Sequence, residues 1–219
     1  MSLLTILYYT SNRQDETFER NIQKKLLESA GDIPIISISH KPIDFGTNIC
    51  VGEQHPCDAN LYRQITIGAK AANTPFVINA EADCLYPPEY FSFIPPTLDS
   101  IYRYTNMYVY SDVHKRFYRK KWSEGGQISG RKHLINLLEH RLDSMSMPYW
   151  SDENDKKFKN PYPKGEKIWL GFSSERPIIS IKAEGGMRER TTLDKTIAPV
   201  YKVPYWGEES DMDRLWGRS

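Results

Sequence analysis

The sequence has 219 residues, of which 39% are hydrophobic and 26% charged, and these proportions are ordinary for a soluble globular protein. The net charge of +1 excludes a general attraction to nucleic acid or to an anionic membrane, so any such attraction must be local. The three cysteines, Cys50, Cys57 and Cys84, show no CxxC spacing, which argues against a zinc site. One of them is unpaired in any disulfide scheme, and the first residues lack the basic region of a signal peptide and the length of a membrane span. We therefore expect a cytoplasmic protein without membrane insertion.

The first half of the chain alternates strand-like and helix-like patterns. An apolar run over residues 3–9 predicts a buried parallel strand, and a helix follows for which Asp15 is the candidate cap. A second strand is expected over residues 33–39, a second helix over residues 58–72 and a third strand over residues 76–79. This alternation predicts a parallel sheet of the doubly wound type, in which ligands bind beyond the carboxyl ends of the strands.

The second half has shorter and less regular patterns. We expect two β-like pieces at residues 101–104 and 107–110, followed by a basic aromatic loop at 114–122 and a helix at 130–145. A polar loop is expected at 151–165, and two strands are expected at 168–170 and 178–181. The sequence has no internal repeat and no clear linker, so we interpret residues 1–219 as a single α/β domain.

Two acidic residues follow the third expected strand. Glu81 and Asp83 are separated by one residue, so along an extended segment their side chains point to the same side. Such oxygen ligands suit a hard divalent cation, Mn²⁺ or Mg²⁺, which can bridge a diphosphate. Acidic triplets also occur in solvated turns, but the position of this one after an apolar strand favours a ligand site.

Four stretches of the sequence resemble, in order, a family of GT-A-fold nucleotide-sugar glycosyltransferases that is similar to glycosyltransferase family 2. They are a Lys-Pro-Ile-Asp-Phe-Gly-Thr-Asn run, the acidic pair with the turn and the Pro-Pro pair after it, and two C-terminal signatures, over residues 41–48, 81–96, 185–188 and 203–207. The resemblance implies a GT-A-like domain with a Rossmann-like mixed, mainly parallel sheet flanked by helices. It implies a nucleotide-sugar-binding half at residues 1–96, and an acceptor-binding half with a C-terminal tail at residues 97–219. It further implies a hexosyl- or pentosyltransferase that uses a UDP-sugar donor and a divalent metal ion.

The resemblance also implies roles for single residues. Asp83 and Glu81 would bind the metal ion, and Asp83 would take part in catalysis through it. Alternatively, Glu81 would organise the turn or contact the donor sugar. The other residues expected to bind the donor follow the first strand, belong to the 41–48 run or lie on the second helix: Tyr9, Thr10, Asn12, Arg13, Asp44, Gly46, Asn48, Arg63 and Lys70.

One position departs from the pattern of this family. Related enzymes commonly carry a His just after the late strand, where it can complete the metal shell, but residues 179–184 here contain none. Lys182 is therefore a further candidate donor-binding residue, whose ammonium would contact the diphosphate and replace part of the work of the metal. Glu184 is an alternative metal ligand, so strict metal dependence stays open.

The candidate catalytic base is Glu124. An inverting transferase needs a carboxylate that deprotonates the acceptor hydroxyl. Glu124 is the only acid in the stretch over residues 122–129, where related enzymes place such a residue. A retaining mechanism, which needs no such base, stays open.

A basic segment, residues 114–122, suggests the acceptor. It holds five Lys or Arg, one His and three aromatic residues, which suit contacts to phosphates and stacking on unpaired bases. The alternative is a surface β-ribbon whose charges keep it soluble. The resembling family includes enzymes described as glycosylating hydroxymethylated pyrimidines in viral DNA, so we expect a DNA acceptor such as 5-hydroxymethylcytosine. The candidate DNA contacts are Lys115, Arg116, Arg119, Lys120 and Trp122, and the aromatic residues Tyr104, Tyr108 and Tyr110 would help to frame an extruded base.

Three other functions stay open. The same fold would also suit a glycan or lipid-linked acceptor. A non-catalytic α/β module that binds nucleotides or nucleic acid is the alternative from another class. A nucleotidyltransferase also uses paired carboxylates, but the absence of a glycine-rich phosphate loop after the first strand disfavours it.

Overall fold

The computed structural model describes residues 2–55, 57–145, 169–182 and 193–218. Its main element is a seven-stranded sheet in the order β10-β6-β9-β4-β1-β2-β3. The strands are β1 (Leu4–Thr10), β2 (Ile35–Ser39), β3 (Thr47–Cys50), β4 (Phe76–Glu81), β6 (Ile101–Tyr104), β9 (Gln127–Gly130) and β10 (Trp169–Phe172). β1 is parallel to β2 and β4, whereas β9 is antiparallel to both β4 and β6. The predicted mixed α/β domain is confirmed, and both halves of the chain contribute strands to its sheet.

β1 lies inside this sheet, and all seven of its residues are buried. Burial on both faces explains its continuous apolar and aromatic run. Its register places Tyr9 opposite Glu81 of β4 and Thr10 opposite Ser39 of β2. The carboxyl ends of the three strands therefore meet at one edge of the sheet.

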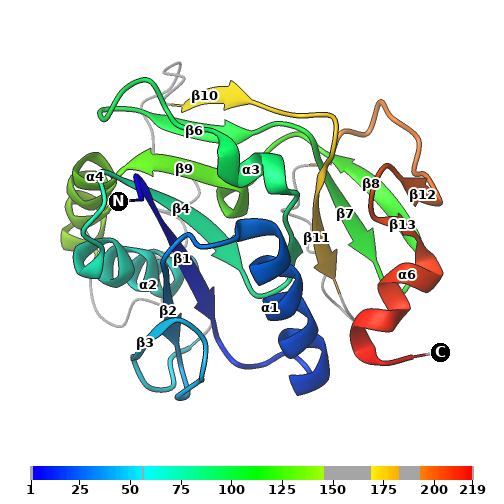
Figure 1. Cartoon of the computed structure of the whole chain (residues 1–219), viewed down its shortest axis with the longest axis horizontal. Helices are drawn as coiled ribbons and strands as arrows, with labels where there is room; N and C mark the ends of the chain where they lie inside the picture. Colours follow the sequence, from blue (N-terminus) through cyan, green and yellow to red (C-terminus); the bar gives the residue numbers. More distant parts are fainter. Residues whose placement is uncertain (1, 56, 146–168, 183–192, 219) are drawn as a thin grey trace.

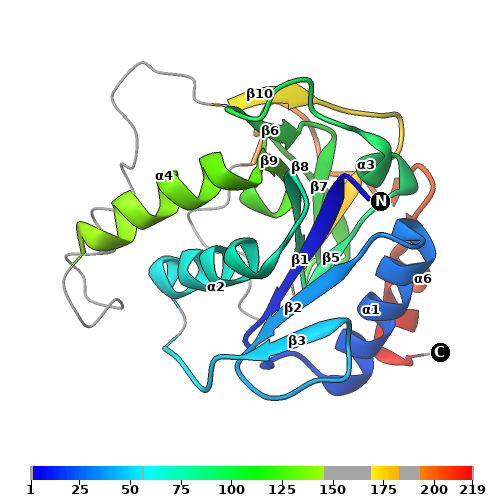
Figure 2. The same ribbon diagram turned by 60° about the vertical axis from the view of Figure 1, so that its left-hand side comes forward.

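Helices cover both faces of the seven-stranded sheet, as the two views show (Figure 1, Figure 2). α1 (Glu16–Ala30) and α3 (Pro88–Ser92) pack on one face, and α2 (Asp58–Ala71) and α4 (Arg131–Asp143) pack on the other. The predicted cap of α1 is confirmed, because the Asp15 carboxylate accepts a hydrogen bond of 3.0 Å from the backbone N–H of Phe18.

A second, four-stranded sheet has the order β5-β11-β7-β8 and lies beside the first (Figure 1). Its strands are β5 (Cys84–Leu85), β7 (Met107–Ser111), β8 (Arg116–Lys120) and β11 (Ile178–Lys182). A short 3-10 helix, η1 (Glu124–Gly126), connects β8 to β9. The C-terminal part forms β12 (Lys202–Val203), β13 (Gly207–Glu208), α6 (Glu209–Asp213) and η2 (Arg214–Trp216), of which η2 packs against α1.

Two sequence expectations are wrong. The basic segment is not a loop, because its residues Arg116–Lys120 form β8, which pairs antiparallel with β7. Phe117 is the one buried residue of this strand, and its four other residues are partly exposed, so the strand carries no alternating apolar pattern. The edge strand β3 was not expected, because its exposed ends and half-buried middle produce no apolar run.

Several expectations fall outside the described residues. These are the polar loop at 151–165, the signature at 185–188, Glu184, and the first residue of the strand expected at 168–170. Within the part of the chain that the structure describes, no helix combines the length and the apolarity that crossing a bilayer requires.

Candidate active site

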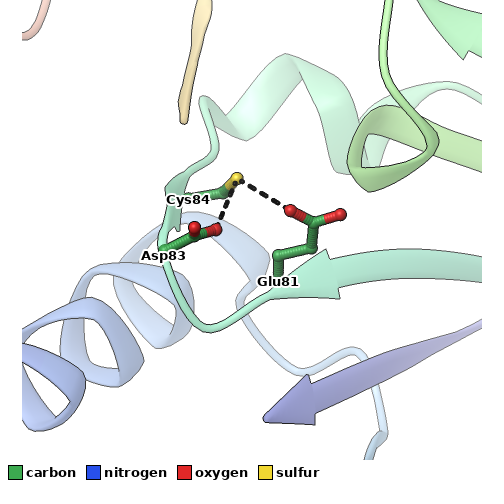
Figure 3. Close-up of side chains that lie close together, drawn as sticks. All are labelled: Glu81, Asp83 and Cys84. Carbon is green, nitrogen blue, oxygen red and sulfur yellow. Dashed lines mark hydrogen bonds between the residues drawn. The ribbon is translucent and has the colours of Figure 1, made fainter. Parts of the chain in front are cut away.

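Three side chains converge where β4 ends. Glu81 is the last residue of β4, Asp83 lies in the turn that follows, and Cys84 begins β5. Their candidate ligand atoms all lie within 4.8 Å of one another, so their spacing alone is that of a metal-binding group (Figure 3). The two carboxylates therefore meet as expected, but the expected geometry is wrong, because the chain bends at Ala82 and Asp83 instead of continuing as an extended strand.

Lys182 forms an ion pair with this group. A hydrogen bond of 2.7 Å from the backbone N–H of Ile181 to the carbonyl of Asp83 fixes the end of β11 against the turn. The Lys182 ammonium consequently contacts the Asp83 carboxylate, with 24% of the lysine side chain and 16% of the aspartate side chain exposed. Burial alone raises the pKa of Asp83, but Lys182 outweighs burial and holds that pKa below its ordinary value.

The Glu81 carboxylate has a different environment. It accepts hydrogen bonds from the Tyr9 hydroxyl at 3.3 Å and from the Cys84 thiol at 3.7 Å. Burial raises the pKa of Glu81, and the nearby charge of Asp83 raises it further. Burial also raises the pKa of the Cys84 thiol, so that the thiol stays a protonated donor to both carboxylates. Of the two carboxylates, Asp83 is therefore the one that is held in its ionised form.

The loop formed by η1 covers Glu81. A Cβ atom on Gly125 would lie 2.6 Å from the Glu81 carboxyl carbon, so a larger residue there would displace the carboxylate. The Tyr86 hydroxyl connects the two segments, because it accepts a hydrogen bond from the Glu81 N–H and donates one to the Gly125 carbonyl, each at 2.8 Å. The Asn79 side-chain amide donates to the Glu124 carbonyl at 3.0 Å. These contacts place the predicted base beside the acidic group.

Glu124 itself is bound by a buried arginine that the sequence analysis missed. Arg103 is 1% exposed and lies in β6, with a guanidinium nitrogen 3.2 Å from a Glu124 carboxylate oxygen. Its Nε donates to the Gln127 side chain at 3.2 Å, and its guanidinium lies over the rings of Trp122 and Trp169. A charged residue within the apolar run Ile101–Tyr104 was the available signal, because an arginine is rarely fully buried without a partner.

The residues predicted to bind the nucleotide lie around the carboxyl ends of β1 and β2. Thr10 is buried and accepts a hydrogen bond from the N–H of Asn12, and the Asn12 side chain accepts one from the N–H of Lys41 at 2.8 Å. The loop after β1 is thereby joined to the loop after β2. Arg13 and Asp44 are exposed, and Arg63 is half-buried on α2.

Asn48 and Gly46 shape the loop after β2. The Asn48 amide donates to the side-chain hydroxyls of Ser37 and Ser39 at 2.9 and 2.8 Å, and its oxygen accepts from the N–H of Ile43 at 3.2 Å. Gly46 has a φ of +62°, and a Cβ atom there would lie 2.6 Å from the Ile35 carbonyl oxygen. Both residues therefore support the wall of the predicted nucleotide site through the backbone fold.

His40 is a second residue that the sequence analysis missed. It follows β2, is 5% exposed, and its Nε2 has no hydrogen-bond partner among the described residues. Burial lowers its pKa, and the positive charges of Arg13 and Arg63 lower it further. Lys70, by contrast, pairs with Glu139 of α4 at 2.5 Å, and the expectation that it contacts the donor has no support.

The basic segment is largely occupied by contacts within the protein. Lys115 pairs with Asp112 at 3.0 Å and with Asp213 at 2.8 Å, and Arg119 donates to the Asn106 side chain and the Thr105 carbonyl. The other candidate DNA-binding residues also have contacts within the protein. The Arg116 guanidinium lies over the ring of Tyr201, the Lys120 ammonium donates to Ser123, and the Trp122 ring lies beneath the Arg103 guanidinium.

The expectation that Tyr104 and Tyr110 frame an acceptor is wrong. Both rings are fully buried, because each packs into a hydrophobic cluster of the interior instead of facing the surface. Tyr108 is only partly buried and packs against Arg119.

A cavity of about 440 Å³ lies elsewhere, between α1 and the C-terminal segment. Its lining includes Lys24, Tyr205 and Trp206 but none of the residues predicted for the site. The chemical groups at the end of β4 therefore mark the candidate active site better than this cavity does.

Comparisons with known proteins bear on the fold. No protein-family model matches the sequence, and no curated protein matches it. Among solved structures, the chain is similar to S. aureus TarS 1-349 in complex with UDP-GlcNAc, with a TM-score of 0.52 and 11% identity over 84% of this chain and 60% of that chain. It is also similar to a glycosyltransferase involved in the glycosylation of the major capsid of PBCV-1 (TM-score 0.48, 12% identity, 80% and 83% covered). A third similar structure is that of the glycosyltransferase GlyE from Streptococcus pneumoniae TIGR4 (TM-score 0.48, 9% identity, 77% and 44% covered).

The similarity to TarS establishes the architecture. The chain has a GT-A-like fold, as the sequence resemblance implied, and it spans 60% of TarS 1-349 and 37% of the longer TarS chain. At 11% identity this similarity concerns the fold alone, so the chemistry has to be argued from the site.

The substitution Glu81→Gln is expected to stabilise the protein. Ionised Glu81 is disfavoured by burial and by Asp83, so its pKa is raised on folding and its ionisation costs stability above that pKa. The neutral amide avoids this cost, and we expect a melting temperature higher by roughly 2–4 °C at pH 8.

The gain should shrink as the pH falls towards the ordinary pKa of a glutamate, where Glu81 is protonated in both the folded and the unfolded state. Thermal melts of the wild type and of Glu81→Gln between pH 4 and pH 8 measure this difference in melting temperature. Glu28→Gln on the exposed face of α1 is the control. An equal or lower melting temperature of Glu81→Gln at pH 8 would contradict the assigned environment.

Proposed function

We propose that this protein transfers a sugar from a nucleoside-diphosphate sugar, namely a UDP-sugar, to an acceptor hydroxyl. The observation that supports this most strongly is the convergence of Glu81, Asp83 and Lys182 at the carboxyl edge of the sheet. Ligands of open α/β sheets bind at this edge. The fold is that of TarS, whose solved complex contains UDP-GlcNAc, and a donor of this chemical class fits the edge described here.

The nucleoside would lie over the ends of β1 and β2. Arg13 follows β1, and Arg63 neighbours Gln64, whose amide donates to the carbonyls of Thr10 and Ile38 at 3.0 Å, so both arginines offer donors and positive charge there. The residues that we propose to line this part of the site are Tyr9, Thr10, Asn12, Arg13, Asp44, Gly46, Asn48 and Arg63.

The diphosphate would lie over the acidic group. Negative charge grows on the leaving diphosphate during transfer, so a cation beside it accelerates the reaction. The sequence predicts Mn²⁺ or Mg²⁺ on Glu81 and Asp83, and Lys182 is a second cation at the same place.

Glu124 is the proposed base. Its carboxylate would accept the proton of the acceptor hydroxyl as the hydroxyl oxygen forms a bond to the anomeric carbon. The bond from that carbon to the diphosphate oxygen breaks in the same step, and the nucleoside diphosphate leaves with the electron pair. Arg103 binds the Glu124 carboxylate and would hold it in one orientation.

A thermal-shift screen of nucleoside diphosphates tests the donor. UDP at about 100 times its Kd should raise the free energy of unfolding by about 2.7 kcal/mol, which is a clear shift in melting temperature. ADP and GDP at equal concentration serve as controls and should give smaller shifts. If no nucleoside diphosphate shifts the melting temperature, with or without Mn²⁺, the proposed function is wrong.

The substitution Glu124→Gln tests catalysis separately from binding. We expect the release of UDP from a UDP-sugar to slow by about 10²–10⁴-fold, the range found when a general base is removed, while the thermal shift by UDP stays unchanged.

Arg103→Lys keeps the positive charge but lacks the planar guanidinium that binds both Glu124 and Gln127, so it should lower kcat more than it raises KM. Full activity of Glu124→Gln would exclude Glu124 as the base, whereas a non-catalytic binding module would release no UDP in any variant.

DNA is the acceptor that we propose for further testing, in the form of a hydroxymethylated pyrimidine. One observation favours it, because the Lys120 ammonium at the end of β8 donates to Ser123 Oγ at 2.9 Å, directly before η1, so the basic segment reaches the candidate active site. Lys115 and Arg119 have internal partners, which leaves Arg116 and the exposed Lys121 as the better candidates for binding phosphates.

The double substitution Arg116→Glu with Lys121→Glu tests the DNA acceptor. The logarithm of DNA affinity should depend less steeply on the logarithm of salt concentration, by about 0.9 for each phosphate that the protein no longer neutralises. The control is Lys24→Glu with Lys25→Glu on α1, which changes the net charge equally. If both pairs behave alike, or if hydroxymethylated duplex DNA accepts no sugar, a glycan or lipid-linked acceptor replaces DNA.

A further inference from the structure

The candidate active site offers a poor set of ligands for a resident divalent cation. Magnesium and manganese ions take oxygen ligands, for which Glu81 and Asp83 are the candidates in this group. Asp83 already has Lys182 as its counter-ion, and the third member of the group, Cys84, donates its thiol proton to both carboxylates. A divalent cation would have to displace the ammonium and the thiol proton. The described residues therefore do not fit such an ion.

The same residues fit a bound ammonium. Lys182 is the last residue of β11, and the hydrogen bond from Ile181 to Asp83 fixes it beside the turn. An ammonium has three donors, so after the bond to Asp83 two remain for phosphate oxygens. The Lys182 side chain is 24% exposed, so the described residues do not enclose it completely.

A second lysine, Lys120, adds to the positive charge of the Lys182 ammonium. Lys120 ends β8 in the same four-stranded sheet as β11, and its ammonium is bonded to Ser123 Oγ at 2.9 Å. Two ammonium groups, those of Lys120 and Lys182, thus lie on the four-stranded sheet beside the candidate active site. A diphosphate gains attraction from such a site without a metal ion.

We propose that Lys182 takes the place of the divalent cation, with its ammonium, oriented by Asp83, binding the donor diphosphate so that the protein works without a metal ion. The inference rests on the proposed function, because it names the cation that acts on the leaving diphosphate. Lys182 contacts the phosphate oxygens directly, whereas Asp83 acts as a positioning residue. Hydrogen bonds between an ammonium and phosphate oxygens are charge-assisted and therefore strong.

A Mn²⁺ titration followed by electron paramagnetic resonance tests the first half of the proposal without any nucleotide. We expect little Mn²⁺ binding by the wild-type protein. Lys182→Met frees Asp83 and should bind Mn²⁺ more tightly by about tenfold or more, the size of one charge-assisted interaction. Lys25→Met, which breaks an ion pair with Glu28 on α1, is the matched control and should not change Mn²⁺ binding. Tight Mn²⁺ binding by the wild type that Lys182→Met leaves unchanged would overturn the proposal.

Thermal shifts by UDP in EDTA test the second half. The wild type should respond equally in EDTA and in Mn²⁺. Lys182→Met should show no response in EDTA and regain part of it in Mn²⁺. A wild-type response that EDTA abolishes would overturn the role of Lys182 and leave the proposed function intact. The absence of any response in either buffer would overturn the proposed function, and with it the role of Lys182.

A second variant covers the case in which Lys182→Met does not fold, since that substitution leaves Asp83 half-buried without a counter-ion. Asp83→Asn keeps the ammonium and removes the carboxylate that a metal ion would need. It should still respond to UDP in EDTA, because the phosphate then provides the negative partner of Lys182. A wild-type response that needs Mn²⁺ and that Asp83→Asn abolishes would support a metal ion on Asp83 and overturn the proposal.

Discussion

The candidate active site depends on the turn at Ala82 and Asp83, where the chain leaves the seven-stranded sheet and enters the four-stranded one. β4 ends at Glu81 and β5 begins at Cys84, so the two sheets are joined by two residues. The hydrogen bond from the N–H of Ile181 to the Asp83 carbonyl holds β11 against this turn. The side chains of both sheets meet there, and neither sheet alone contains the whole group.

A layer of buried tyrosines supports the turn. The Tyr9 hydroxyl donates to the Glu81 carboxylate, and the Tyr86 hydroxyl joins the Glu81 backbone to Gly125. Tyr90 donates to the carbonyls of Asn79 and Gln127, which joins β4 to β9. Burial raises the pKa of all three phenols, so they remain protonated donors at any pH at which the protein is folded. Their rings fill the core while their hydroxyls hold the backbone around the two carboxylates.

Local periodicity was sufficient to predict the buried strands and the two long helices in the first half of the fold. Continuous apolar runs mark the buried strands β1 and β4, and the four-residue spacing of Phe18, Ile22 and Leu26 marks α1. β3 escaped prediction because an edge strand with exposed ends carries no apolar pattern. β8 forms a strand instead of the expected loop, and its charges conceal the single buried residue, Phe117, that distinguishes the two.

The site was less predictable than the fold because its key contacts join distant parts of the chain. Lys182 contacts Asp83 across 99 positions, and Tyr9 contacts Glu81 across 72. A sequence pattern can propose each residue, but only the topology shows that Lys182 and Asp83 neutralise each other. The link between Arg103 and Glu124 was missed for the same reason, although a charge inside an apolar strand was visible in the sequence.

An ammonium in place of a dication places different demands on the rest of the protein. It carries half the charge of Mn²⁺ and cannot surround a phosphate with several ligand positions, so other groups must share the stabilisation of the leaving diphosphate. Lys120 supplies a second charge from β8, and the close approach of Gly125 to Glu81 excludes bulk water from one side of the carboxylates. Water exclusion strengthens the remaining electrostatic interactions, because the local dielectric falls. Gly125 of η1 and Lys120 of β8 therefore compensate for the lower charge of the Lys182 ammonium. Gly125 lowers the local dielectric, and Lys120 adds a second positive charge.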